Sequence, residues 1–86
     1  MAMKNPPHPG ETLRDWIHGH RTTVVETARR LEVSRASLNR VLAGRSGLSA
    51  DMAVRLERIG WSDAAFWATL QAQYDVAEAR KRAAAA

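Results

Sequence analysis

Five polar residues between positions 34 and 40 have the side chains needed to hydrogen-bond the edges of DNA bases. Arginine can hold guanine through two hydrogen bonds and asparagine can hold adenine in the same way, each good pair discriminating by about 1–3 kcal/mol. The serine hydroxyls nearby can pair with several bases. The predicted base-reading residues are Ser34, Arg35, Ser37, Asn39 and Arg40.

Three further residues stand at helix ends or in the loop that follows. Hydroxyls, exposed N–H groups and a guanidinium at such places suit phosphate oxygens, and they position a protein without reading bases. The predicted phosphate-binding residues are Thr22, Thr23 and Arg45.

The distribution of charge agrees with this interpretation. Between Arg29 and Arg45 there are five arginines and one acidic residue, Glu32, a net charge of +4. The whole chain has 13 basic and 9 acidic residues and is also +4, so the rest of the chain sums to zero. The entire positive excess therefore lies where a phosphate-binding surface requires it. A solvated basic face with no partner is the alternative for this cluster.

These residues need two short helices joined by a tight turn. Thr23 and Glu26 have the spacing of a capping box, in which the hydroxyl caps the helix and the carboxylate returns to the N–H of the cap. An apolar face follows at intervals of four and three residues: Val24, Ala28 and Leu31.

A second helix is predicted to begin after Ser34, a good N-cap, and to stop at Gly44, which suits a left-handed backbone. Its apolar stripe is Leu38, Val41 and Leu42. Two helices with a turn of about three residues, and small Ala28 where they approach, are typical of the helix-turn-helix, whose second helix enters the DNA major groove.

Another helix is predicted before this pair. Pro9 suits the first helical position because its missing N–H would have no partner there, and Gly19 offers an end. The apolar stripe between them is Leu13, Trp16 and Ile17. We expect residues 1–8 to form an extended arm, residues 9–78 one domain, and residues 79–86 a helix end or tail.

Two more helices are predicted after the pair. Ser49 caps the fourth, Gly60 ends it, and its buried residues are Met52, Ala53, Leu56 and Ile59. The residues expected to face solvent on this helix are Arg55, Glu57 and Arg58. Ser62 is predicted to cap the fifth helix, with Asp63 in its first turn. The expected fold class is therefore all-α, with five helices and a helix-turn-helix at the second and third.

Large apolar residues gather near the end of the chain. An aromatic stripe at helical spacing usually belongs to the core, but so small a domain has difficulty surrounding many large rings. The other interpretation is a subunit interface, where aromatic anchors dominate the binding energy. The residues predicted for a dimer interface are Trp61, Phe66, Trp67, Leu70 and Tyr74.

Composition narrows the class of protein. With 86 residues, 45% hydrophobic and 26% charged, the chain is typical of one globular domain that a second copy would help to stabilise. It has no cysteine, which excludes disulfides and thiolate zinc sites and fits a reducing cytoplasm. No apolar run approaches the roughly 18 residues of a membrane span, and no signal-peptide pattern is present. We expect a cytoplasmic protein with no membrane partner.

No catalytic, metal or cofactor site is predicted. His18 and His20 flank a helix end without sharing a face, and no cysteine or clustered carboxylate completes a metal shell, so these and His8 are expected at the surface. No nucleophile and base stand together, and no phosphate loop is present. We therefore expect a protein that is not an enzyme. Three acidic residues that could be considered for catalysis are better explained as charges at helix starts or on the surface: Asp51, Glu57 and Asp63.

Four stretches of the sequence resemble the HigA antitoxins of bacterial toxin–antitoxin pairs. They are HPGE at 8–11, VSRASLNRVLAGR at 33–45, LSADMAVRLE at 48–57 and FWATLQAQYD at 66–75. The order of five helices also resembles the lambda-repressor-like, or XRE, DNA-binding domains. One departure is Glu32, at a turn position where XRE proteins often carry glycine. If the backbone there is left-handed, a non-glycine residue costs on the order of 1 kcal/mol, which does not undo the assignment.

The resemblance implies a bacterial, cytoplasmic, nucleoid-associated protein that represses its own operon as a homodimer on a palindromic operator. It also implies that the protein binds and neutralises a HigB-type toxin, a ribosome-dependent mRNA endonuclease related to the RelE group. In HigA-like proteins the dimer contact commonly involves the C-terminal helical region. A stand-alone XRE-family transcriptional regulator with no toxin partner is the alternative.

Overall fold

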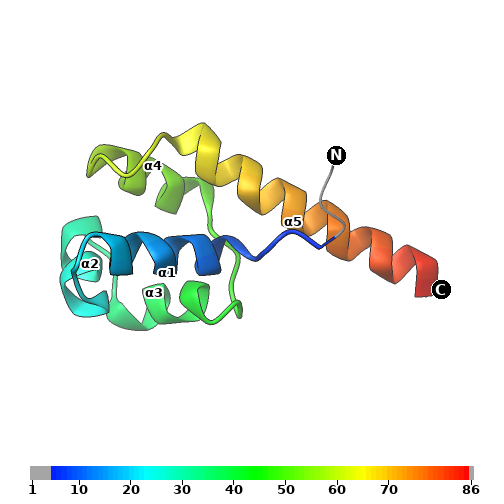
Figure 1. The fold of residues 1–86 in the computed structure, drawn as a ribbon, viewed down its shortest axis with the longest axis horizontal. Helices are drawn as coiled ribbons and strands as arrows, with labels where there is room; N and C mark the ends of the chain where they lie inside the picture. The colour runs from blue at the N-terminus through cyan, green and yellow to red at the C-terminus, as the bar shows by residue number, and fades with distance from the viewer. Residues whose placement is uncertain (1–4, 86) are drawn as a thin grey trace.

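The structure, a computed structural model, describes residues 5–85 and contains five helices (Figure 1). No strand occurs within that range, and the all-α expectation is confirmed. The helices are α1 (Pro9–Gly19), α2 (Val24–Leu31), α3 (Arg35–Leu42), α4 (Ala50–Arg58) and α5 (Ala64–Ala85).

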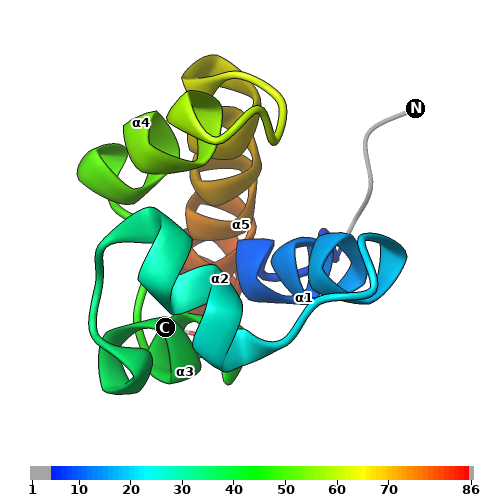
Figure 2. The ribbon, with the colours of Figure 1, turned by 90° about the vertical axis from the view of Figure 1, so that its left-hand side faces the viewer.

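The helices form one body around a shared core. Helix α1 packs against both α3 and α5, helix α2 packs against α3 and α4, and α4 packs against α5. Seen from the side of α2 and α3, α4 and α1 flank α5 (Figure 2). The C-terminal half of α5 projects beyond the other helices (Figure 1), which gives the molecule its longest dimension of 42 Å.

Every helix contributes a fully buried side chain to the core. Trp67 is the largest of them, and its indole Nε1 donates a hydrogen bond of 2.6 Å to the carbonyl of Trp61. This bond pairs a buried indole N–H that would otherwise cost free energy. Each of the four remaining helices contributes a fully buried leucine: Leu13, Leu31, Leu38 and Leu56.

Three of the predicted helix caps are confirmed. The hydroxyls of Thr23, Ser34 and Ser49 each accept the backbone N–H three residues later, at 3.1, 3.0 and 3.1 Å. Capping satisfies a donor that the helix itself cannot pair. Gly44 and Gly60 take positive φ angles of 75° and 87° just after their helices, as predicted for C-terminal stops.

Two predictions about helix starts are corrected. The carboxylate of Glu26 does not return to the N–H of Thr23, because it binds the guanidinium of Arg29 one turn away. Ser62 does not cap α5, because its own backbone is left-handed, at a φ of 61°. Asp63 provides the cap instead, and its Oδ1 accepts the N–H of Phe66 at 2.7 Å.

The residue before α1 is part of the packed domain, which corrects the expectation of a surface histidine. His8 is 7% exposed, and its Nδ1 accepts the N–H of Gly10 at 2.9 Å, which caps α1. Its ring meets the edge of Tyr74 on α5 with 4.9 Å between centroids. Pro9 occupies the first helical position as predicted. The first four residues of the predicted arm lie outside the described residues.

Candidate nucleic-acid interface

Helices α2 and α3 form the predicted helix-turn-helix. The turn between them passes through Glu32, which is left-handed with φ 58° and ψ 41°. The N–H of Glu32 donates to the carbonyl of Arg29, and the N–H of Val33 donates to the carbonyl of Ala28, both at 3.1 Å. These bonds close α2 as a left-handed cap does, so the unusual backbone at Glu32 is what directs the chain into α3.

Helix α3 has one buried and one exposed side. Its buried side consists of Leu38, Val41 and Leu42, which join the core. The predicted base-reading residues lie away from that core: Ser34, Arg35, Asn39 and Arg40 are exposed and Ser37 is half-buried. Helix α3 thus presents hydrogen-bonding side chains to solvent from Arg35 to Arg40, while its apolar stripe holds it on the body.

Three of these side chains are linked to one another. Ser34 Oγ donates to Ser37 Oγ at 2.8 Å while accepting the backbone N–H of Ser37. Arg40 Nη2 also donates to Ser37 Oγ, at 3.3 Å. The hydroxyl of Ser37 therefore holds the guanidinium of Arg40 one turn back toward the start of α3.

The predicted phosphate-binding residues lie at the ends of the helix pair. Thr23 is exposed at the start of α2, with its hydroxyl oxygen already accepting the N–H of Glu26, and Thr22 beside it is half-buried. Arg45 is exposed in the loop after α3, where its N–H donates to the carbonyl of Arg40 at 2.9 Å.

The five arginines of this segment do not all serve one surface. Arg29 pairs with Glu26, and this hydrogen bond lowers the pKa of the Glu26 carboxyl below its ordinary value. Arg30 lies 6.0 Å from the ring centre of Trp61 and donates to the carbonyl of Ile59. The arginines on α3 and in the loop after it are the other three: Arg35, Arg40 and Arg45.

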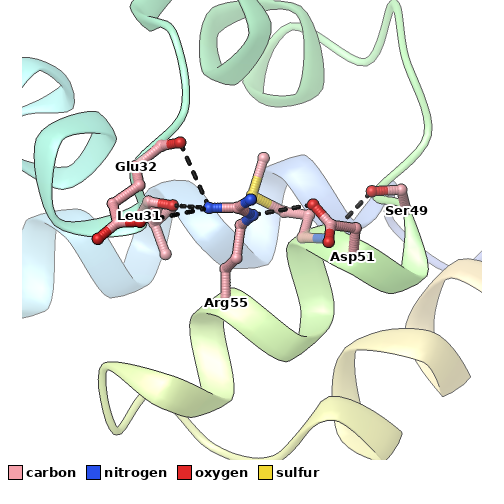
Figure 3. A network of polar contacts seen from close by, with 6 residues as sticks. Leu31, Glu32, Ser49, Asp51 and Arg55 are labelled. Carbon is pink, nitrogen blue, oxygen red and sulfur yellow. Dashed lines mark hydrogen bonds and ion pairs between the residues drawn. The ribbon is translucent and has the colours of Figure 1, made fainter.

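Sequence reasoning missed the role of Arg55, which was expected to face solvent with Glu57 and Arg58. Its side chain is only 28% exposed and points from α4 to the end of α2 (Figure 3). Arg55 Nη1 donates to the carbonyls of Leu31 and Glu32, at 2.9 and 3.3 Å. The spacing of four residues from Asp51 could have indicated the local pair, but not the contact with α2.

The residues predicted for a dimer interface divide into two groups. Trp61 and Trp67 are 2% and 0% exposed within a single copy, so this part of the prediction is corrected: both rings fill the core instead of meeting a partner. Phe66 is 37% exposed, and Leu70 and Tyr74 are half-buried. Only these last three keep surface that a second copy could contact.

The described part of the chain has neither a cluster of metal ligands nor a membrane-spanning helix. Between residues 5 and 85, no three His, Cys, Asp or Glu side chains gather as a metal ion would require. No helix in the described part of the chain combines the length and apolar character needed to cross a membrane.

Known proteins resemble this chain over nearly its whole length. No protein-family model matches it. The virulence-associated protein A' of Dichelobacter nodosus is 40% identical over 85 residues, which are 98% of this chain and 74% of the relative. An uncharacterized HTH-type transcriptional regulator of Escherichia coli, YddM, is 31% identical over 94% of this chain and 86% of its own length.

Solved structures resemble it as well. PA4674 of Pseudomonas aeruginosa, crystallised in complex with its 28-bp operator DNA, superposes with a TM-score of 0.82 at 41% identity, over 87% of this chain and 84% of its own. The Pseudomonas aeruginosa antitoxin HigA, solved with the higBA promoter, has a TM-score of 0.86 at 38% identity, over 91% and 86%. These scores show that both share the fold of this chain over the superposed residues.

Proposed function

Because this chain belongs to the HigA-type antitoxins, which carry an XRE-like helix-turn-helix, we propose that it binds the operator of its own operon and represses transcription. The proposal includes a homodimer on a palindromic operator, with one α3 helix in the major groove of each half-site. In such a dimer the two α3 helices lie about 34 Å apart, one turn of the duplex.

The exposed side of α3 carries the proposal. It combines guanidinium, amide and hydroxyl groups that reach into solvent, while Leu38, Val41 and Leu42 hold the opposite side in the core. A helix that enters the major groove needs this division, because only groups free of the core can meet base edges. Two relatives that share the fold have been solved with operator or promoter DNA, which further supports the proposal.

Substitutions on α3 and in the next loop test the assigned roles. Asn39→Ala should relax specificity at one or two base pairs, because it removes a contact to a base edge. Arg45→Ala should weaken binding to all sequences alike and reduce the salt slope by about 1, because it removes a phosphate contact. Arg58→Ala, which removes an exposed charge from α4, is the control.

Fluorescence anisotropy measures the affinity and its salt dependence for each variant. The duplexes are the chain's own promoter fragment, single-base variants of that fragment and a non-operator duplex. Equal affinity of the unmodified chain for promoter and non-operator duplexes would overturn the proposal. If Asn39→Ala instead weakened binding equally to all single-base variants, Asn39 would contact phosphate and not a base.

The dimer is proposed to form along the outer side of α5. Phe66 is an exposed aromatic residue there, and α5 continues well past the rest of the body (Figure 1). Phe66→Asp should shift sedimentation from dimer to monomer and weaken operator binding, since a buried charge without a partner is costly. Val25→Asp, at an exposed apolar residue on α2, is the control and should stay dimeric. A monomeric unmodified chain would refute this part.

We further propose that the chain binds and neutralises a HigB-type toxin related to RelE. Its membership of the antitoxin family supports this. Co-expression with the adjacent reading frame tests it: a stable two-protein complex and rescued growth are expected. A neighbour that neither binds nor harms the cell would favour a stand-alone transcriptional regulator.

A further inference from the structure

The geometry points to Arg55 as a positioning residue that fixes the orientation of α3 by clamping the end of α2. This inference rests on the proposed function, because orientation of α3 matters for reading an operator. Arg55 itself lies on α4 and is not among the residues assigned to DNA.

The clamp joins groups that the helices leave unpaired. The last carbonyls of a helix have no partner within it. Those of Leu31 and Glu32 receive Arg55 Nη1, at 2.9 and 3.3 Å, and the carboxylate of Glu32 lies 4.0 Å from the same nitrogen. A cation at the C-terminus of a helix is also favoured by the helix dipole. The guanidinium thus satisfies the end of α2 directly.

The other side of the guanidinium is held on its own helix. Arg55 Nε donates to Asp51 Oδ2 at 2.8 Å, so the planar group has one edge fixed on α4 and the other on α2 (Figure 3). Helix α4 in turn is packed on α5 and buries Met52, Ala53 and Leu56. Arg55 therefore links the turn of the helix-turn-helix to α4, to which no DNA contact is assigned.

Backbone hydrogen bonds from the N–H groups of Glu32 and Val33 close α2 at this turn, and Arg55 adds the bonds that tie the turn to α4. Glu32 is left-handed, which costs a non-glycine residue free energy, and its side chain is largely exposed. Two residues later the chain starts α3 at the Ser34 cap. A change of backbone angles at Glu32 would swing α3 as a unit, so the contacts of Arg55 with the Leu31 and Glu32 carbonyls restrain the angle at which α3 leaves α2.

The test compares Arg55→Ala with Arg58→Ala. Both variants remove one positive charge from α4, so the loss of long-range attraction to DNA is the same in the two and drops out of the comparison. Arg58 is exposed and lies one turn from the clamp. Arg55→Ala should lose about tenfold in operator affinity with no more than about a twofold change on a non-operator duplex, because only register with the bases is disturbed. Arg58→Ala should change both by less than about twofold.

Two outcomes of this comparison overturn the inference. One is an operator preference in Arg55→Ala equal to that in Arg58→Ala. The other is uniform weakening with a salt slope reduced by about 1, which would make Arg55 a phosphate contact. If the unmodified chain itself showed no preference for its operator, the proposed function would be overturned instead. Failure of the inference and failure of the proposed function therefore give different results.

Hydrogen exchange gives a second readout that needs no DNA. The amides of Glu32 and Val33, which close α2, should exchange about tenfold faster in Arg55→Ala than in Arg58→Ala. If Arg55→Ala does not fold, Asp51→Asn replaces it, since it loosens the guanidinium without removing it; smaller changes in the same directions are expected. Unchanged exchange at both amides overturns the clamp.

Discussion

Replacing Gly10 with alanine should separate α1 from α3, because these two helices touch at this residue without room for a side chain. A Cβ at position 10 would lie 2.1 Å from the carbonyl oxygen of Val41 and 3.0 Å from His8 Nδ1. The Val41 carbonyl cannot turn aside freely, since it is part of α3 and accepts the N–H of Gly44 at 3.0 Å. Relief therefore requires one helix to move.

The expected loss follows from two opposing effects. Overpacking a well-packed contact costs about 1–3 kcal/mol, and a clash with backbone belongs at the upper end. Alanine in place of glycine inside a helix returns about 0.5–1 kcal/mol. The net loss in unfolding free energy should be about 1–2 kcal/mol, which corresponds to a fall in Tm of about 5–15 °C for a domain of this size.

Thermal and urea unfolding followed by circular dichroism measure this loss, with Gly19→Ala as the matched control. A Cβ at Gly19, on the same helix, meets nothing in the rest of the described chain within 4 Å, so that variant should be as stable as the unmodified chain or slightly more so. If Gly10→Ala proved as stable as Gly19→Ala, the close approach of α1 and α3 would not exist in solution.

Three further predictions concern single interactions. Thr23→Ala should lower the unfolding free energy by about 1 kcal/mol in urea titration, because the cap of α2 is lost, whereas an unchanged midpoint would contradict the capping bond. Trp67→Phe should cost about 2–4 kcal/mol by the same method, since it leaves the Trp61 carbonyl without its donor and opens space in the core; a loss below 1 kcal/mol would refute this. Arg29 lowers the pKa of the Glu26 carboxyl below its ordinary value of 4.5. The pair therefore stabilises the fold at any pH above 4.5, and this stabilisation is lost as the pH falls through the lowered pKa. Glu26→Gln should therefore lose less stability than the unmodified chain when unfolding is measured from pH 5 downward, and parallel losses would rule the contribution out.

The helices and their caps could be predicted from the sequence because their signals are local. Thr23, Ser34 and Ser49 each bond a backbone N–H three residues away, and Gly44 ends its helix by its own backbone. The exposed side of α3 follows from the same local periodicity, since Leu38, Val41 and Leu42 identify the side that faces the core.

Contacts between distant residues could not be predicted in this way. His8 looks like a surface residue until α5 brings Tyr74 over its ring, and Arg55 looks solvent-facing until α4 brings it to the end of α2. Their partners lie 66 and 24 residues away in sequence. The same holds for Trp61, which is enclosed within one copy because the rings of Trp16 and His20, far earlier in the chain, lie against its indole.

The bonds around Ser37 determine the polarity that this side chain can show to DNA in the proposed complex. A hydroxyl has two lone pairs and one hydrogen. Arg40 Nη2 donates to Ser37 Oγ and occupies one lone pair; when Ser34 Oγ donates to the other, only the hydrogen of Ser37 is free. Ser37 would then select for acceptors such as guanine O6 and N7 or thymine O4, and would discriminate against the exocyclic amino groups of adenine and cytosine.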